Sequence, residues 1–305
     1  MRTIPSPSSA QAVIAVSDLS CRFGSKTVLD SVSLYVPPGS VFGLVGENGA
    51  GKTTLIRHLL GLLVPRSGTV SILGGDPAAE PVRVLSQVGY LSEYRDLPSW
   101  MRIDELLRFT SAFYPGWDFA YAEQLRDEFQ LAPSARVRNL SQGQQAKAGL
   151  LVALAYRPAL LILDEPSTGL DPVVRRDLLE VIIRSISEQG MTVLFSSHLL
   201  DEIERVCDQI ALLHEGRMVL HGPLDQVKQG HRRFVLRFDE VQEQAPRIPC
   251  ALSVKGTGRE WQVLCDGLRH EMAANADALG ARILDEQTPS LDEIFMARVK
   301  GSRTR

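Results

Sequence analysis

An apolar run that leads into a glycine-rich loop and then a helix constrains the fold of this chain most strongly. Val41 to Val45 is typical of a buried strand, and residues 46–53 read Gly-Glu-Asn-Gly-Ala-Gly-Lys-Thr. A helical pattern runs from Lys52 to about Leu63. Glycines in such a loop let successive backbone N–H groups approach an anion without Cβ clashes, and the helix N-terminus adds positive potential. The segment therefore predicts a phosphate-binding loop at a strand end of an α/β sheet.

The residue types in this loop indicate a nucleoside triphosphate with a divalent cation. Lys52 supplies a mobile positive charge to the β and γ phosphates, and the Thr53 hydroxyl is placed to bind Mg²⁺. A chance glycine loop followed by Lys-Thr is the alternative, and the flanking strand and helix argue against it. The residues expected to bind ATP here are Gly46, Asn48, Gly49, Ala50, Gly51, Lys52, Thr53 and Thr54.

A second apolar strand ends in two carboxylates. Residues 160–165 read Leu-Leu-Ile-Leu-Asp-Glu. Beside a triphosphate, Asp164 is expected to hold the Mg²⁺ coordination shell, and Glu165 is expected to polarise the attacking water as a general base. An ordinary strand end with solvated acids is the alternative for this segment taken alone.

A resemblance to a known family enters with the residues between these two elements. Leu140-Ser141-Gln142-Gly143-Gln144 is similar to the Leu-Ser-Gly-Gly-Gln signature of ABC ATPases. Ser141 is a plausible N-cap and Gly143 lacks a side chain, so the helix start offers donors to an anion. The resemblance implies that residues 141–144 contact the γ-phosphate of an ATP held by a second cassette. A plain capping Ser before a core helix is the alternative, and it does not explain the spacing.

Three further residues match the family in the required order. Phe23 resembles the aromatic that stacks on adenine, although a lone aromatic is otherwise assigned to a core. Asp171, in Gly-Leu-Asp at 169–171, resembles the loop that crosses the dimer. His198 resembles the switch histidine that contacts the γ-phosphate and orients water, although a lone histidine is more often structural.

One position departs from the family pattern. After the Gly-Tyr-Leu strand the family has a glutamine, whereas this chain has Glu93, and Gln87 lies too early to replace it. Glu93 can accept a hydrogen bond from water or bind Mg²⁺, but it adds negative charge near a triphosphate. We therefore expect Glu93, with Thr53 and Asp164, among the metal ligands.

The order of patterns predicts the domain organisation. Short β-rich runs alternate with helical segments, which favours an α/β fold with a helical insertion and a small C-terminal α+β domain. The resemblance implies that this α/β fold is a P-loop NTPase cassette of the ABC type. Near Gly230 the pattern changes, because Phe234 to Phe238 alternates as a strand and Ser290 to Val299 is typical of an amphipathic helix. We expect a disordered N-terminus over 1–11, the cassette over 12–230 with its helical subdomain at about 97–157, and an accessory domain over 231–305.

Composition excludes several classes of protein. The net charge of −3, from 33 basic and 36 acidic residues, gives no overall basic field, so no nucleic-acid partner is expected. The most apolar region, Leu150 to Leu163, is interrupted by Arg157 and Pro158 and falls short of the roughly 18 to 20 residues that cross a bilayer. The four cysteines are far apart, which is not typical of a zinc site. A cytoplasmic protein is expected.

The resemblance covers residues 12–225 and implies an ATP-binding and ATP-hydrolysing transporter subunit. It implies that two cassettes, identical or related, dimerise on ATP, and that Glu165 and His198 are catalytic. The dimer would drive a separate transmembrane permease from the cytoplasmic face of the cell membrane. The tail from Pro289 to Phe295 resembles cassettes that serve ABC-2-type exporters, which favours export. A soluble ABC ATPase that acts on ribosomes or DNA is the alternative, but no second cassette, heptad run or basic tail is visible.

An apolar cluster in the helical region is a candidate contact for that permease. Leu97, Pro98, Trp100 and Met101 lie in a segment expected to be an exposed loop, which suits a docking helix. Burial of the cluster inside the cassette is the alternative.

Overall fold

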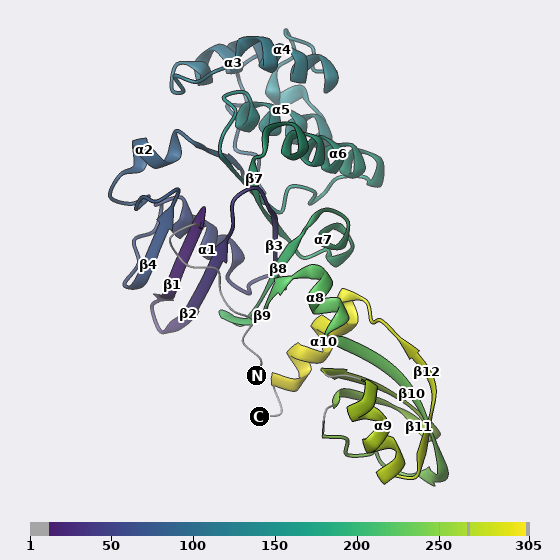
Figure 1. The fold of residues 1–305 in the computed structure, drawn as a ribbon. Coiled ribbons are helices and arrows are strands. Elements are labelled where there is room, and N and C mark those ends of the chain that lie inside the picture. The colour runs from purple at the N-terminus through teal and green to yellow at the C-terminus, as the bar shows by residue number, and fades with distance from the viewer. Residues whose placement is uncertain (1–11, 250, 267–268, 303–305) are drawn as a thin grey trace. The chain divides into compact units, whose positions relative to one another are not determined.

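The computed structural model describes residues 12–249, 251–266 and 269–302, which form two units (Figure 1). Contacts between Cα atoms divide the chain into Met1–Met218 and Val219–Arg305. This boundary precedes the change of pattern near Gly230. The segment 1–11, expected to be disordered, lies outside the described residues.

The described strands and helices follow an α/β order in the first unit and an α+β order in the second. The strands are β1 (Ile14–Phe23), β2 (Lys26–Val36), β3 (Val41–Val45), β4 (Ser67–Ile72), β5 (Val88–Leu91), β6 (Leu160–Asp164), β7 (Thr192–Ser197), β8 (Gln209–His214), β9 (Arg217–Pro223), β10 (His231–Gln242), β11 (Ala251–Asp266) and β12 (Ala281–Gln287). The helices are α1 (Lys52–Leu59), α2 (Pro81–Leu85), α3 (Ile103–Ser111), α4 (Phe119–Glu128), the 3₁₀ helix η2 (Val137–Asn139), α5 (Gln142–Leu154), α6 (Pro172–Gln189), α7 (Leu200–Val206), α8 (Leu224–Gln229), α9 (Arg269–Ala278) and α10 (Leu291–Ser302). Across the described ranges, no helix combines the length and hydropathy that a bilayer crossing requires.

A six-stranded sheet positions the candidate site. Its order is β5-β6-β7-β3-β8-β9, and β3 pairs in parallel with β7 and β8, as β6 does with β5 and β7. All residues of β3, β6 and β7 are buried, as expected of parallel strands covered on both faces. In register, Val45 lies beside Ser197, and Asp164 beside Ser196. The carboxyl ends of these strands therefore meet at one edge, and the predicted α/β fold is confirmed.

Helix α1 joins this sheet to a second, antiparallel sheet of order β2-β1-β4. It contacts β2 and β4 on one side and β6 on the other. Leu55, Ile56 and Leu59 of α1 are fully buried in one apolar cluster with residues of both sheets. Each such side chain contributes about 1.5–3 kcal/mol of burial free energy, so the helix that begins at Lys52 is firmly anchored. It ends at Leu59 rather than near Leu63.

The helical region of the first unit is built on α5. This helix contacts strand β5 as well as α3, α4 and α6, and Figure 1 shows α3, α4 and α5 packed together. Its buried face includes Ala146, Leu150 and Leu154. Strand β5 therefore lies directly against α5, the helix on which the helical region is built.

The second unit is a small antiparallel sheet with helices. Its order is β11-β10-β12, with Phe234 opposite Val263 and Leu236 opposite Trp261. Phe234, Leu236 and Phe238 are buried, which follows the alternation read from the sequence. Helix α10 begins with reciprocal bonds in which Ser290 N–H donates to Glu293 Oε2 (2.9 Å) and Glu293 N–H donates to Ser290 Oγ (3.2 Å).

Candidate functional site

The loop between β3 and α1, residues 46–54 and here called the P-loop, has a course that only glycine permits at two positions. A Cβ at Gly46 would lie 2.4 Å from the carbonyl oxygen of Leu213 on β8. Gly51 has φ +111°, in the left-handed region, and precedes α1 as its N-cap residue. The backbone N–H groups at the start of α1 are thereby presented at the carboxyl edge of the sheet.

Lys52 is buried at the first position of α1 and its charge is fully engaged. The ammonium donates to the carbonyl oxygens of Gly46 (2.6 Å) and Glu47 (3.4 Å). Its Nζ lies 3.0 Å from Glu165 Oε1 in an ion pair whose two side chains are each only 6% exposed. A buried charge requires such partners, so a competing anion must replace them to bind this lysine.

Glu165 is held in an unusual backbone conformation at the end of β6. Its φ is +50°, although it is not glycine, and its N–H donates to Ser196 O on β7 (3.0 Å). Its second oxygen, Oε2, lies 2.7 Å from Nδ1 of His198, which follows β7. Because an ionised carboxylate only accepts, Nδ1 carries the proton in this contact. The carboxylate is thus placed between a lysine and a histidine.

Asp164 lies beside these residues and is almost completely buried. Burial raises the pKa of its carboxyl, while the nearby Thr53 and Ser196 hydroxyls and the Lys52 charge act in the opposite direction. Its Oδ1 atom is buried without a hydrogen-bond partner. Such an atom requires a partner from outside the chain.

The residues present fit a magnesium ion. A buried, unpartnered carboxylate oxygen beside a threonine hydroxyl is a hard oxygen donor set of the kind that Mg²⁺ prefers. Among the described residues no group of three or more His, Cys, Asp or Glu is placed to hold a metal. Glu93 is half-buried in the loop after β5, whose Leu91 pairs with Leu163, so it follows the neighbouring strand. Asp164 and Thr53 are the better-placed ligands.

A buried carboxylate that sequence reasoning missed supports this edge. Glu202 on α7 accepts from Ser167 Oγ (2.7 Å) and Ser197 Oγ (3.1 Å), and Arg175 Nε lies 3.2 Å from its Oε1. Burial raises the pKa of Glu202 above its ordinary value. The signal in the sequence was Ser197 itself, since a hydroxyl at the end of a buried strand needs a partner.

Residues 141–144, here called the signature segment, do not join this cluster. Ser141 Oγ accepts from Gln144 N–H (3.2 Å) and Gln144 Oε1 accepts from Ser141 N–H (3.0 Å), which makes a capping box at the start of α5. Within the described chain, no hydrogen bond links this segment to the P-loop. The segment lies instead beside Gly169, where a Cβ would come 2.9 Å from Gln142 Oε1.

The remaining predicted residues have local roles that the structure defines. Asp171 Oδ1 accepts from Val173 N–H (3.0 Å) and Val174 N–H (3.1 Å), so it caps α6. Phe23 is 51% exposed at the tip of the β1–β2 hairpin, and the carbonyl of Val28 on β2 lies against Gly51 of the P-loop. An exposed ring on a hairpin beside the P-loop is available to a ligand rather than used in the core.

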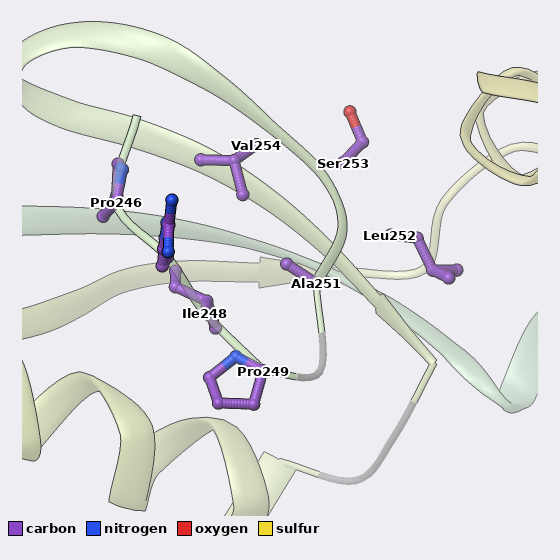
Figure 2. A pocket seen from close by; sticks show the side chains of 8 residues that line it. Pro246, Ile248, Pro249, Ala251, Leu252, Ser253 and Val254 are labelled. Carbon is purple, nitrogen blue, oxygen red and sulfur yellow. The ribbon is translucent and has the colours of Figure 1, made fainter. Parts of the chain in front are cut away.

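A hollow in the second unit has no comparable chemistry. Figure 2 shows Pro246, Ile248, Pro249, Ala251 and Val254 around it, and Arg247, Leu252 and Ser253 complete the described lining. No carboxylate, imidazole or thiol is among these described residues. The cluster of Lys52, Glu165 and His198 lies in the first unit.

Comparisons with known proteins give one consistent result. The family model described as ABC transporter matches residues 29–168. The ABC transporter ATP-binding protein YtrB of Bacillus subtilis (strain 168) is 29% identical over 294 residues, which are 95% of this chain and 99% of that protein. The Nod factor export ATP-binding protein I of Paraburkholderia xenovorans (strain LB400) is 36% identical over 70% of this chain and 71% of that protein. The solved structure of an ATP-binding subunit of an ABC transporter aligns with a TM-score of 0.65 and 34% identity over 71% of this chain and 92% of that one.

Proposed function

This chain belongs to the ABC transporter family as an ATP-binding, ATP-hydrolysing subunit, and we propose that two such cassettes close on ATP to drive a separate membrane-spanning exporter. The observation that carries the proposal is the position of Glu165 between Lys52 and His198, at the strand edge that presents the P-loop. The P-loop N–H groups and the oxygen atoms of Thr53 and Asp164 at that edge match a triphosphate and its cation.

Each group at this edge has a part in hydrolysis. The γ-phosphate competes with Glu165 for Lys52, and the P-loop N–H groups bind the phosphate chain. Glu165 Oε1, released from Lys52, accepts a proton from the attacking water while His198 Nδ1–H keeps the carboxylate oriented through Oε2. The water oxygen bonds to the γ-phosphorus as the bond to the β–γ bridging oxygen breaks, and ADP leaves. Mg²⁺ held by Thr53 and Asp164 would neutralise charge on the phosphate oxygens.

The second half of each ATP site comes from another cassette. Ser141, Gln142 and Gln144 are exposed, and among the described residues no hydrogen bond links the signature segment to its own P-loop. The capped N-terminus of α5 attracts anions. An ATP bound to Lys52 of one chain therefore meets residues 141–144 of the other chain. Asp171 and Gly169, beside Gln142, lie on the face that this arrangement brings together.

The membrane partner is proposed to contact the loop 93–101 of this chain, with the cassette on the cytoplasmic face of the cell membrane. Trp100 in this loop is 66% exposed, whereas Leu97, Pro98 and Met101 are half-buried, so the loop offers one large apolar side chain on an ordered base. Export is favoured by the relative whose name describes Nod factor export.

ATP-dependent association tests the two-cassette arrangement. Purified Glu165→Gln protein should elute as a dimer with Mg²⁺ and ATP and as a monomer with ADP. The double variant Glu165→Gln with Ser141→Arg places a large side chain at the proposed contact and should remain monomeric with ATP. Dimers that persist in the double variant, or that form without nucleotide, would contradict the arrangement.

A second experiment tests the transport assignment. Tagged Glu165→Gln protein is recovered from native membranes in mild detergent with ATP, and the co-purifying proteins are identified with and without Trp100→Ala. A polytopic membrane protein whose recovery depends on Trp100 supports the transporter proposal. Recovery of ribosomal or DNA-associated proteins alone would support a soluble ATPase and reject the exporter.

A further inference from the structure

Arg95 makes a contact between distant segments of the chain and has no role in the reaction steps proposed above. It lies two residues after Glu93 in the loop that follows β5, and its guanidinium reaches the turn that follows β6. There Nη2 donates to the carbonyl oxygens of Thr168 (2.5 Å) and Pro166 (3.4 Å). The contact joins segments more than 70 residues apart, and both carbonyls belong to the turn that begins at Glu165.

The backbone of the loop is adapted to this contact. Arg95 has φ +51°, a conformation that costs about 1–3 kcal/mol for a side chain of this kind. Its N–H donates to Ser92 O (3.1 Å), and its carbonyl accepts from Leu97 N–H (2.6 Å). A strained backbone conformation persists only where neighbouring contacts stabilise it. At Arg95 the hydrogen bonds of the guanidinium are such contacts.

The turn over residues 165–169 needs such support. Both ends are left-handed, with φ +50° at Glu165 and +74° at Gly169. Thr168 N–H donates to Glu165 O (3.2 Å), and Thr168 Oγ1 lies 3.5 Å from Glu165 Oε2. Ser167 is tied to Glu202 on the other side. The carbonyls of Pro166 and Thr168 are the groups that Arg95 holds, so its position affects the residue that carries the catalytic carboxylate.

The charge of Arg95 also bears on the unusual residue before it. Burial lowers the pKa of Arg95 and the Glu93 carboxylate raises it, and an arginine stays charged in either case. Glu93 and Arg95 therefore attract one another within one loop. The charge of Arg95 therefore offsets part of the negative charge that stands here in place of a glutamine.

We propose that Arg95 is a positioning residue for ATP hydrolysis, which fixes the 165–169 turn, and with it Glu165, relative to the loop 92–96. The inference rests on the proposed role of Glu165 in hydrolysis. The loop 92–96 and the catalytic turn then move together, because one guanidinium bonds two carbonyls of the turn.

Steady-state ATP hydrolysis by the full-length protein tests this role. The variants are Arg95→Ala, Arg95→Lys and Glu165→Gln, with Arg83→Ala as the matched control. Arg83 is an arginine of the same unit that pairs on the surface with Glu80. For Arg95→Ala we expect kcat to fall about tenfold to a hundredfold with KM for ATP nearly unchanged, since a small displacement of a catalytic group has effects of this size. Arg95→Lys should recover only part of kcat, because its ammonium can also donate to these carbonyls but lies on a shorter side chain than Nη2 of the arginine.

Thermal unfolding midpoints separate positioning from folding. A wild-type midpoint with reduced kcat in either Arg95 variant supports the proposal. Wild-type kcat in Arg95→Ala would overturn it; if that variant fails to fold, wild-type kcat in Arg95→Lys would do so. Should Glu165→Gln hydrolyse ATP at the wild-type rate, the proposed function of Glu165 fails; should it lose hydrolysis while Arg95→Ala keeps it, only the inference about Arg95 fails.

Discussion

At the scale of single residues, the carboxylate of Glu165 has one neighbour for each of its two oxygens. Lys52 occupies Oε1 and His198 occupies Oε2. Glu165→Gln keeps the shape of the side chain but removes the base, so ATP hydrolysis should fall by about 10²–10⁴. ATP affinity should be equal or higher, because Lys52 loses its anionic competitor.

Phosphate release and equilibrium binding of a fluorescent ATP analogue measure these two effects. The matched control is Glu80→Gln, which removes a carboxylate from the surface pair with Arg83. Equal losses of hydrolysis and of ATP binding in Glu165→Gln would show that Glu165 supports the nucleotide site rather than the chemical step.

Glu202 predicts a pH dependence of stability. Burial raises its pKa, so above the ordinary value of 4.5 the folded protein keeps a proton that the unfolded chain has lost. The free energy of unfolding therefore decreases as the pH rises through this window. Glu202→Gln cannot lose that proton, and its decrease from about pH 4.5 to pH 7 should be smaller than in the wild type.

Urea denaturation at several pH values measures the Glu202 effect, with Glu80→Gln as the exposed control. Parallel curves of unfolding free energy for wild type and Glu202→Gln would mean that Arg175 keeps the carboxylate ionised throughout.

At the scale of elements, the start of α5 has a structural role as a capped helix end and a proposed functional role as a phosphate contact. Substitutions at Ser141 can separate the two roles. Ser141→Ala removes the N-cap and should lower the free energy of unfolding by about 1 kcal/mol. Ser141→Asp restores a cap, so stability should return. It also places a negative charge where the other cassette's phosphate is proposed to bind, and ATP-dependent dimerisation should be lost.

Denaturation and size-exclusion chromatography of both variants test the division of roles at Ser141. If Ser141→Asp dimerises at the same ATP concentration as the wild type, the proposed phosphate contact of the signature segment is rejected and only its capping role remains.

Elements whose signals are local could be predicted from the sequence. The P-loop and the strand that ends at Asp164 are recognisable because glycine conformation and a buried strand end act within a few residues. The start of β2 carries no such local signal, since Lys26 and Thr27 are exposed and polar. Strand β8 was not predicted, although Gly46 of the P-loop lies against its residue Leu213.

Contacts between distant segments could not be predicted. Arg95 reads as a solvated loop charge, and only the fold brings it to Pro166 and Thr168. Glu202 reads as one acid among several on an exposed helix, and its burial depends on how α7 packs against β3 and β7. Such residues are determined by tertiary packing, which no local pattern records.

At the scale of the whole molecule, the residues proposed to be catalytic all lie in one unit. These residues fall between Phe23 and His198, before the boundary after Met218. All buried members of the apolar cluster around α1 also belong to the first unit. A chain that ends at Pro223, the last residue of β9, should therefore fold and hydrolyse ATP with wild-type kcat. Ending before α8 avoids exposing Leu224 and Val227, which are buried in the full-length chain.

The thermal midpoint and kcat of this shortened chain, beside those of the full-length protein, test its independence. A shortened chain that is unfolded, or folded but inactive, would show that the second unit is needed for the first.

The left-handed backbone of Glu165 has a consequence for selection acting on the whole protein. A glycine or asparagine adopts φ +50° more easily than a glutamate does, and the strain relieved is about 1 kcal/mol or more. Neither replacement supplies a base. Each replacement also removes the anionic partner of buried Lys52, a loss that outweighs the strain relieved, so selection for durability and selection for turnover both retain glutamate at this single codon.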